Sequence, residues 1–517
     1  MTTRRPNILL FFTDQQRADT VAALGNATIR TPAMDRLCRE GTAFTRCYTP
    51  SPVCVPARYS MATGLPPHRS GCFDNGSRPV RAPSFMDRLA AAGYQTQGIG
   101  KMHFVPEGRA LWGFEKRDFS EEVTVADDFG KTLCDAGYGH VEEPHGIRSE
   151  MYYIPQPSQL PARLHQTTWV ADRSIDFLKR RDRSRPFFLM SSFIKPHPPF
   201  ESPTPWNKLY RAAQMAPPFR PAGFEDLLTY WNRVQNRYKY RDHGYDELLV
   251  RTIRAAYYSC ISFIDYNLGR VLEALGGEMD DTLIVFTSDH GEMLGDYGSF
   301  GKRCMLDAAA RVPMIVRWSG RAAAGARCAA PASLQDLWRT FLQAAGADEW
   351  HGRPAHVPEN VAPSAEESAN LLDLAAGRDN RDVVFSQFQQ GGYAVYMAAS
   401  AGQKYVYSAP DDREWFFDAS RDPAETKDLS GDPACAAAMG ALRQRLLDRF
   451  GRDGYTGPLE GTGWRHHPKQ SIPTDPDFGL LFQDADGLQD RINALGEYAR
   501  QVTIPPEESL RLLKPKE

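Results

Sequence analysis

Near-continuous apolar runs that end in polar residues recur along the chain. The clearest cover residues 7–14, 186–193 and 282–289. Runs of this length and composition are typical of β-strands that are covered on both faces, as in a parallel sheet. The pattern therefore predicts buried strands whose polar ends are free to do chemistry.

Helix-like stretches alternate with these runs, at residues 31–40, 84–92, 168–180 and 249–275. Strands that alternate with helices predict an α/β fold, with a large, mostly parallel sheet sandwiched by helices. In such sheets ligands bind beyond the carboxyl ends of the strands. Asp14 and Asp289 each end an apolar run. We therefore expect both carboxylates to reach one pocket.

The pattern changes in the carboxyl-terminal third. Residues 346–377 are rich in Pro, Ala, Glu and Asn and indicate a connecting region. Short alternating runs then predict a small antiparallel sheet, followed by a closing helix; they lie at residues 383–386, 393–396, 404–407 and 415–418, with the helix at 434–449. We expect an α/β domain over residues 1–375, a β subdomain with its helix over 376–456, and an extended segment over 457–517 that packs on the body.

Composition excludes several classes of protein. The 517 residues are 42% hydrophobic, enough for a large core. The 61 Lys and Arg residues nearly balance 64 Asp and Glu residues, with no block of like charge, so neither nucleic acid nor an anionic membrane is an expected partner. The apolar run at residues 7–12 is shorter than a signal-peptide core, and no stretch reaches the ~18 apolar residues that span a bilayer.

The nine cysteines are scattered and form no CxxC pair. This argues against a disulfide framework and against a thiolate zinc site. We therefore expect a cytoplasmic chain in which every cysteine other than Cys54 is a buried thiol.

Cys54 stands in a distinctive setting. Residues 50–56 form a proline-rich, turn-forming approach, and residues 57–63 look helical and are closed by Gly64. Cys54 would then lie at a helix N-terminus, where backbone N–H groups and the helix dipole favour an anion, and Arg58 would return to the same face. The setting predicts a site for a tetrahedral oxyanion.

The segment Cys54-Val-Pro-Ala-Arg58, continuing to Thr63-Gly64, resembles the signature of type I sulfatases of the alkaline phosphatase superfamily. In that family a formylglycine-generating or other sulfatase-maturing enzyme oxidises the cysteine to formylglycine. The resemblance implies a hydrated aldehyde, in which one hydroxyl, ionised by a bound divalent cation, attacks sulfur. Loss of the second hydroxyl's proton then expels sulfate, and Arg58 stabilises the transferring charge.

Two further segments, residues 7–15 and 287–296, resemble the metal segments of sulfatases. The resemblance implies one divalent cation, with ligands from Asp14, Gln15, Asp289, His290 and the modified Cys54. Many sulfatases have paired aspartates at the first segment, and some have asparagine in place of the histidine. The present set looks like that of choline sulfatases and phosphonate monoester hydrolases. Oxygen ligands suit Ca²⁺ and imidazole is accepted by Mn²⁺, so both cations remain candidates.

Residues 97–104 predict a strand in which Lys101 and His103 share a face, and their Gly-Lys-x-His pattern resembles a sulfatase motif. His197, in the rigid loop that begins at Lys195, matches a second family histidine. Lys302 corresponds to the family lysine that contacts sulfate and the leaving oxygen. His103, His197 and Lys302 are all candidates for protonating the leaving group, with His197 favoured.

Substrate binding is thus expected from Asn75, Lys101, His197 and Lys302, although an Asn-Gly pair such as that at Asn75 is also a common turn. Residues 104–166 and the last sixty or so residues match nothing in the family, and we expect them to line the pocket and to select the substrate.

The leading hypothesis is hydrolysis of a sulfate monoester of a sugar, alkyl or aryl alcohol. A phosphonate monoester or phosphodiester hydrolase with the same apparatus is the alternative. Lys101 and His103 favour sulfate, because phosphonate hydrolases have neutral hydroxyl residues in that region. A binding module without activity would show damage to these residues, and none is present. A homo-oligomer is compatible with the sequence.

Overall fold

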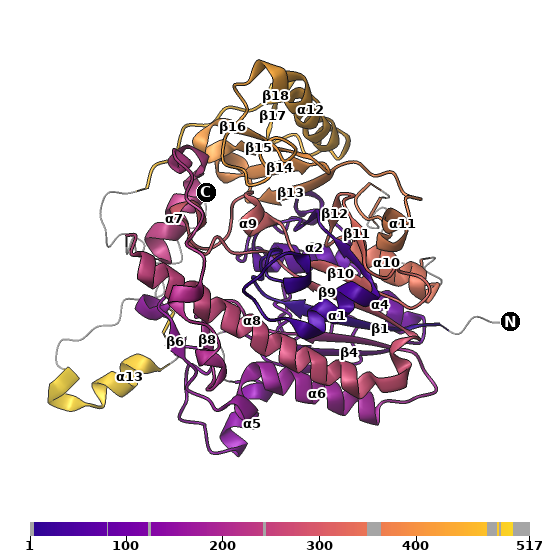
Figure 1. The fold of residues 1–517 in the computed structure, drawn as a ribbon, viewed down its shortest axis with the longest axis vertical. Coiled ribbons are helices and arrows are strands. Elements are labelled where there is room, and N and C mark those ends of the chain that lie inside the picture. Colours follow the sequence, from indigo (N-terminus) through magenta and orange to yellow (C-terminus); the bar gives the residue numbers. More distant parts are fainter. Residues whose placement is uncertain are drawn as a thin grey trace.

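A computed structural model describes residues 5–79, 81–122, 126–240, 244–348, 363–364, 366–472, 483–484 and 487–499. Its centre is an eight-stranded sheet in the order β11-β2-β10-β9-β1-β7-β4-β5 (Figure 1). In that order the strands are Ala326–Cys328, Thr42–Phe44, Met314–Arg317, Thr282–Ser288, Asn7–Thr13, Phe187–Ser192, Gln95–Gly100 and Lys116–Phe119. Only β10 runs antiparallel to its neighbours, so the predicted mostly parallel sheet is confirmed.

Helices cover both faces of this sheet, because alternate side chains of β1 point to opposite sides. Leu9 and Phe11 join the core formed with α1 (Pro32–Glu40), α6 (Gln166–Arg180) and α8 (Glu247–Leu275). Ile8, Leu10 and Phe12 join the core formed with α2 (Cys54–Thr63), α4 (Phe85–Ala91) and α10 (Asp336–Ala345). Burial on both faces is the reason why the strand sequence is almost entirely apolar.

Helix ends follow local sequence signals. The Ser84 and Asp87 pair forms a capping box at α4, and the Asp246 side chain accepts a hydrogen bond from Leu249 N at the start of α8. Gly64 ends α2 in the left-handed conformation, with φ of 74°. The remaining helices of the large body are α3 (Pro67–Ser70), α5 (Asp128–Asp135), α7 (Tyr230–Tyr238), α9 (Asp307–Ala310) and α11 (Leu371–Ala375).

A second sheet of four antiparallel strands follows in the order β13-β14-β15-β16. Its strands are Val384–Phe388, Val395–Ala399, Gln403–Ser408 and Arg413–Asp418. One face packs on the large body and the other on α12 (Ala436–Arg452), as Figure 1 shows. The predicted small antiparallel sheet with a closing helix is therefore confirmed.

Short elements complete the described chain. Two-stranded pairs join β3 (Cys47–Tyr48) to β12 (Ala332–Ser333) and β6 (Gln156–Pro157) to β8 (Glu201–Ser202). The tail forms a hairpin of β17 (Leu459–Glu460) and β18 (Gly463–Trp464), then helix α13 (Leu488–Asn493). Trp464 stacks on Tyr407 of β15 and anchors the hairpin, and the expected extended segment over residues 457–517 stays a prediction. Residues 473–482 and 500–517 lie outside the described residues, as do 349–362 of the connecting region, and the division into three parts stays a prediction.

Two expectations need correction. Strand β4 ends at Gly100, so Lys101 and His103 do not share a strand face. The chain turns there because Gly100 has φ of 88° and its Cα approaches the carbonyl oxygen of Ser192 too closely for a side chain. All nine cysteines are free, but Cys134 is exposed and Cys328 is half-buried.

Across the described residues we find no helix with the length and apolar character needed to cross a bilayer.

Candidate active site

Four adjacent parallel strands deliver side chains to one edge of the sheet. Asp289 follows β9, Asp14 follows β1, Ser192 ends β7 and Lys101 follows β4. The carboxyl ends of these strands lie next to one another, which is where open α/β sheets place their ligands. The expectation that Asp14 and Asp289 reach one site is confirmed, since Arg58 binds both carboxylates.

Cys54 is the first residue of α2 and is buried at the floor of a cavity. Lys302 Nζ donates to its Sγ at 3.1 Å, and His290 Nε2 lies 3.2 Å from the same sulfur. Burial alone raises the pKa of the thiol. The charges of Lys302, Lys101 and His290, with a hydrogen bond from His103, hold that pKa well below its usual value. The position is built to hold negative charge.

Arg58 lies one turn further along α2 and is fully buried. Its Nε donates to Asp289 Oδ2 at 3.0 Å and its second terminal nitrogen to Asp14 Oδ2 at 3.1 Å. Burial lowers the pKa of the guanidinium, but the two carboxylates outweigh it and raise that pKa. Arg58 therefore ties α2 to the ends of β1 and β9.

The donors of Asp14, Cys54, Asp289 and His290 lie within 4.8 Å of one another. His290 Nδ1 is 3.1 Å from the carbonyl oxygen of Gly291, which leaves Nε2 turned to the centre as a ligand. Burial and the nearby charge of Asp14 raise the pKa of Asp289, although His290 and Arg58 act in the opposite direction. Two carboxylates and one imidazole fit a divalent cation.

Gln15 stands beside this cluster, and its side chain bridges two neighbours. Lys302 Nζ donates to Gln15 Oε1 at 2.6 Å, while Gln15 Nε2 donates to Glu292. Glu292 also accepts from Gly301 N at 2.6 Å, just before Lys302. Sequence reasoning missed Glu292, which fixes the loop that carries Lys302. A ligand role for Gln15 stays a prediction.

Lys101 and His103 both lie near Cys54, but only His103 lines the cavity. Lys101 is fully buried, with its Nζ 2.6 Å from Asp14 Oδ2 and paired with Glu122, and it does not contribute to the cavity wall. His103 lines the cavity, and its Nδ1 has no partner among the described residues. The structure brings both residues to Cys54, although by a turn and not by a strand.

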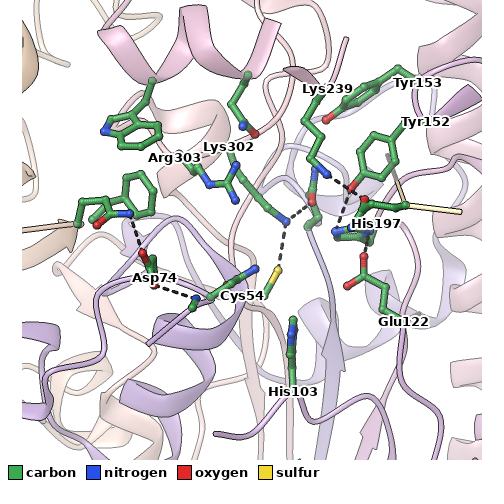
Figure 2. Close-up of a pocket in the computed structure, with 18 residues that line it drawn as sticks. Cys54, Asp74, His103, Glu122, Tyr152, Tyr153, His197, Lys239, Lys302 and Arg303 are labelled. Carbon is green, nitrogen blue, oxygen red and sulfur yellow. Dashed lines mark hydrogen bonds and ion pairs between the residues drawn. The ribbon is translucent and has the colours of Figure 1, made fainter. Parts of the chain in front are cut away.

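His197 lines the cavity beside Tyr152 and is held through its Nδ1 (Figure 2). That atom is 3.0 Å from Glu122 Oε1 and 2.7 Å from the carbonyl oxygen of Pro198. Its Nε2 faces the Tyr152 hydroxyl at 3.5 Å, inside the cavity. Although burial raises the pKa of Glu122, the charges of His197, Lys101 and Arg148 hold it well below its usual value. Glu122 is thus an anion that orients the imidazole.

The cavity has a volume of about 350 Å³ and is shown in Figure 2. Asn75 lines it, and Asn75 Oδ1 accepts a hydrogen bond from Val55 N in the first turn of α2. Sequence reasoning missed several lining residues, which are Asp74, Glu122, Tyr152, Tyr153, Trp231, Gln235, Lys239, Arg303, Phe388, Gln389 and Gln483. Four of these residues come from the two stretches that match nothing in the family, and they are Glu122, Tyr152, Tyr153 and Gln483. The expectation that these stretches line the pocket is confirmed, and their selection of the substrate stays a prediction.

This sheet, with a buried cysteine, an arginine and a carboxylate–imidazole cluster at its edge, defines a hydrolase of the alkaline phosphatase superfamily. Residues 6–347 match the family model described as Sulfatase, and the chain belongs to that family. It is 30% identical over 488 residues to an arylsulfatase of Clostridium perfringens, a match that covers 87% of this chain and 96% of the relative. The family makes the protein an enzyme that hydrolyses sulfuric esters.

Two further proteins are similar to this chain over most of its length. It is 31% identical over 504 residues to a multifunctional alkaline phosphatase superfamily protein of Trinickia caryophylli, covering 86% of this chain and 95% of that protein. The solved phosphonate monoester hydrolase of Agrobacterium radiobacter superposes with a TM-score of 0.73 at 26% identity, covering 87% and 96% of the two chains.

Proposed function

We propose that the protein hydrolyses a sulfate monoester through a formylglycine made from Cys54. The observation that carries this proposal is the position of Cys54 at the N-terminus of α2, on the cavity floor, where Lys302 and His290 reach its sulfur. Asp14, Asp289 and His290 would hold a divalent cation there, with Gln15 as a further ligand. When bound, such a cation lowers the pKa of a hydroxyl group and offsets the charge of a sulfate.

The surrounding side chains have distinct tasks in this proposal. Lys302 and His103 face Cys54 from two sides and neutralise the oxygens of the sulfate. Arg58 keeps Asp14 and Asp289 in position. His197 presents Nε2 to the cavity while Glu122 holds its Nδ1, the arrangement of a general acid for the leaving oxygen. Lys101 acts through Asp14 and Glu122.

Hydrolysis of a phosphonate monoester or phosphodiester is the second candidate. The similarity to the Agrobacterium radiobacter phosphonate monoester hydrolase favours it, as does the Asp14-Gln15 and Asp289-His290 set. Lys101 and His103 favour sulfate, since both stand close to Cys54 as cationic or imidazole groups.

A substrate comparison tests the proposal. Purified native protein is assayed with an aryl sulfate, a phosphate diester and a phosphonate monoester, beside Cys54→Ala and the exposed-thiol control Cys134→Ala. We expect sulfate hydrolysis to be lost in Cys54→Ala and kept in Cys134→Ala, and the mass of the Cys54 peptide to show an aldehyde in place of the thiol. Unchanged activity of Cys54→Ala would contradict the mechanism, and faster phosphonate turnover would select the second candidate.

Removal of the cation is tested separately. After treatment with a chelator, activity is expected to fall and to return on addition of Ca²⁺ or Mn²⁺, and the cation that restores more activity identifies the resident one. Full activity in the chelator, with no metal detected by elemental analysis, would remove the cation from the proposal.

A further inference from the structure

Three cationic side chains enter the cavity from one wall, Lys239, Lys302 and Arg303, while His103 faces them across Cys54 (Figure 2). Lys302 donates hydrogen bonds to Cys54 and Gln15 at the reaction centre. Lys239 follows α7, and Arg303 follows Lys302 in the next loop. Within the described part of the chain, no hydrogen bond joins Lys239 or Arg303 to Cys54 or Gln15.

Neither of these two cations has an anionic partner among the described residues. Lys239 Nζ donates to the neutral Gln483 Oε1 at 3.1 Å and lies 4.2 Å from the centroid of the Tyr152 ring. The Arg303 guanidinium lies 5.9 Å from the centroid of the Phe388 ring, and within the described part of the chain it makes no ion pair. Aromatic faces attract cations but do not neutralise them.

The carboxylates of the cavity wall are engaged elsewhere. Glu122 is paired with Lys101 and Arg148 as well as with His197. Asp74 accepts hydrogen bonds from Gln389 Nε2 at 2.8 Å and from Gly76 N at 2.8 Å. Glu122 raises the pKa of Lys239 and Asp74 raises that of Arg303, but burial outweighs both, and within the described part of the chain neither carboxylate forms an ion pair with these cations.

Uncompensated cations are costly in a partly desolvated cavity. Burial and the charges of Arg303, Arg148 and Lys302 hold the pKa of Lys239 well below its usual value, and burial lowers the pKa of Arg303. A bound anion would relieve this cost by placing a negative charge beside both side chains. Lysine and the planar fork of arginine together suit a sulfate or a carboxylate.

We propose that Lys239 and Arg303 form a second anion subsite, which binds an additional sulfate or carboxylate on the organic half of the substrate. The inference rests on the proposed sulfatase activity. The cavity of about 350 Å³ has room for a leaving group of monosaccharide or aryl size, with Trp231 and Phe388 available to pack on it. The substrate would thus carry at least two negative charges.

Three matched substrates test the subsite: a nitrophenyl sulfate, the same sulfate with a ring carboxylate, and the same ring with a second sulfate. For the native protein we expect kcat/KM to be about tenfold or more higher for the two charged substrates, as for charge-assisted hydrogen bonds. Lys239→Met and Arg303→Gln should each lower the ratio of charged to uncharged kcat/KM by a similar factor, whereas Lys208→Met, at an exposed lysine, should leave the ratio unchanged. The better of the two charged substrates identifies the preferred anion.

Equal kcat/KM for all three substrates, or ratios that survive both variants, would overturn the subsite while leaving the sulfatase activity intact. If no sulfate is hydrolysed, the proposed activity fails and the subsite is decided by binding alone. For this, calorimetry compares the carboxylated phenol with the plain phenol on Cys54→Ala and on Cys54→Ala combined with Lys239→Met. Tighter binding of the carboxylated phenol that disappears in the combined variant supports the subsite, and no difference between the phenols refutes it.

Discussion

Replacing Arg58 with methionine should destabilise the protein in a way that a divalent cation repairs. Arg58 is fully buried and its guanidinium bridges Asp14 and Asp289 at 3.1 and 3.0 Å. Methionine keeps much of the volume but leaves two buried carboxylates facing each other. Loss of one partner of a buried ion pair costs about 3–5 kcal/mol.

The remaining contacts place the cost near the lower end of that range. Asp14 keeps Lys101 Nζ at 2.6 Å, and Asp289 keeps backbone donors from Gln15 and His290 at 2.9 Å each. The Lys101 carbonyl also keeps a donor in the Ser192 hydroxyl. We therefore expect a loss of roughly 3 kcal/mol in the free energy of unfolding without metal, and a smaller loss when Ca²⁺ or Mn²⁺ supplies the missing charge.

Urea unfolding followed by tryptophan fluorescence measures this, with chelator and then with saturating cation. Arg381→Met is the matched control, because Arg381 forms a buried ion pair with Asp336 at 2.5 Å away from the metal cluster. It should destabilise the protein to an extent that the cation does not change. The reasoning is refuted if Arg58→Met costs less than about 1 kcal/mol in chelator, or if the cation protects both variants equally.

Three further results are expected. Gly64→Ala should cost about 2 kcal/mol or more in the free energy of unfolding and should lower activity, because the new Cβ at φ of 74° would lie 2.6 Å from a proline side chain. The control Gly71→Ala, with φ of 72° and open space around it, should cost only about 1 kcal/mol. Equal losses in the two variants would exclude the clash. Burial raises the pKa of Asp265 to about 7, so the folded protein keeps a proton that the unfolded chain releases. The free energy of unfolding should therefore fall as pH rises from about 4 to 7. This pH dependence should be weaker in Asp265→Asn, and identical slopes for the two proteins would contradict the shift. Glu122→Gln should lower kcat for alkyl sulfates more than for nitrophenyl sulfate. His197 then loses the anion that orients it, and only poor leaving groups need a proton from His197. An equal loss of kcat on both substrates would assign Glu122 a structural role alone.

Local sequence signals carried much of the fold. The apolar runs that form β1, β7 and β9 end at the functional edge as expected. They could be predicted because a strand buried on both faces is almost entirely apolar in sequence. The start of α2 at Cys54 and its end at Gly64 also follow from local rules. The chemistry of Cys54 was recognised from its motif, since residues close in sequence carry it.

The sequence by itself thus determined the α/β class, the strand ends that carry Asp14 and Asp289, and the helix that carries Cys54. Only the tertiary structure placed Glu122 against His197, and Lys239 beside Arg303, because these pairs join segments that no local periodicity relates. It also decided that Lys101 and His103 leave β4 through a turn, since the close approach of Ser192 to Gly100 arises from the pairing of β4 with β7. Propensity and period act over a few residues, whereas the charge balance of a cavity depends on packing across the whole chain.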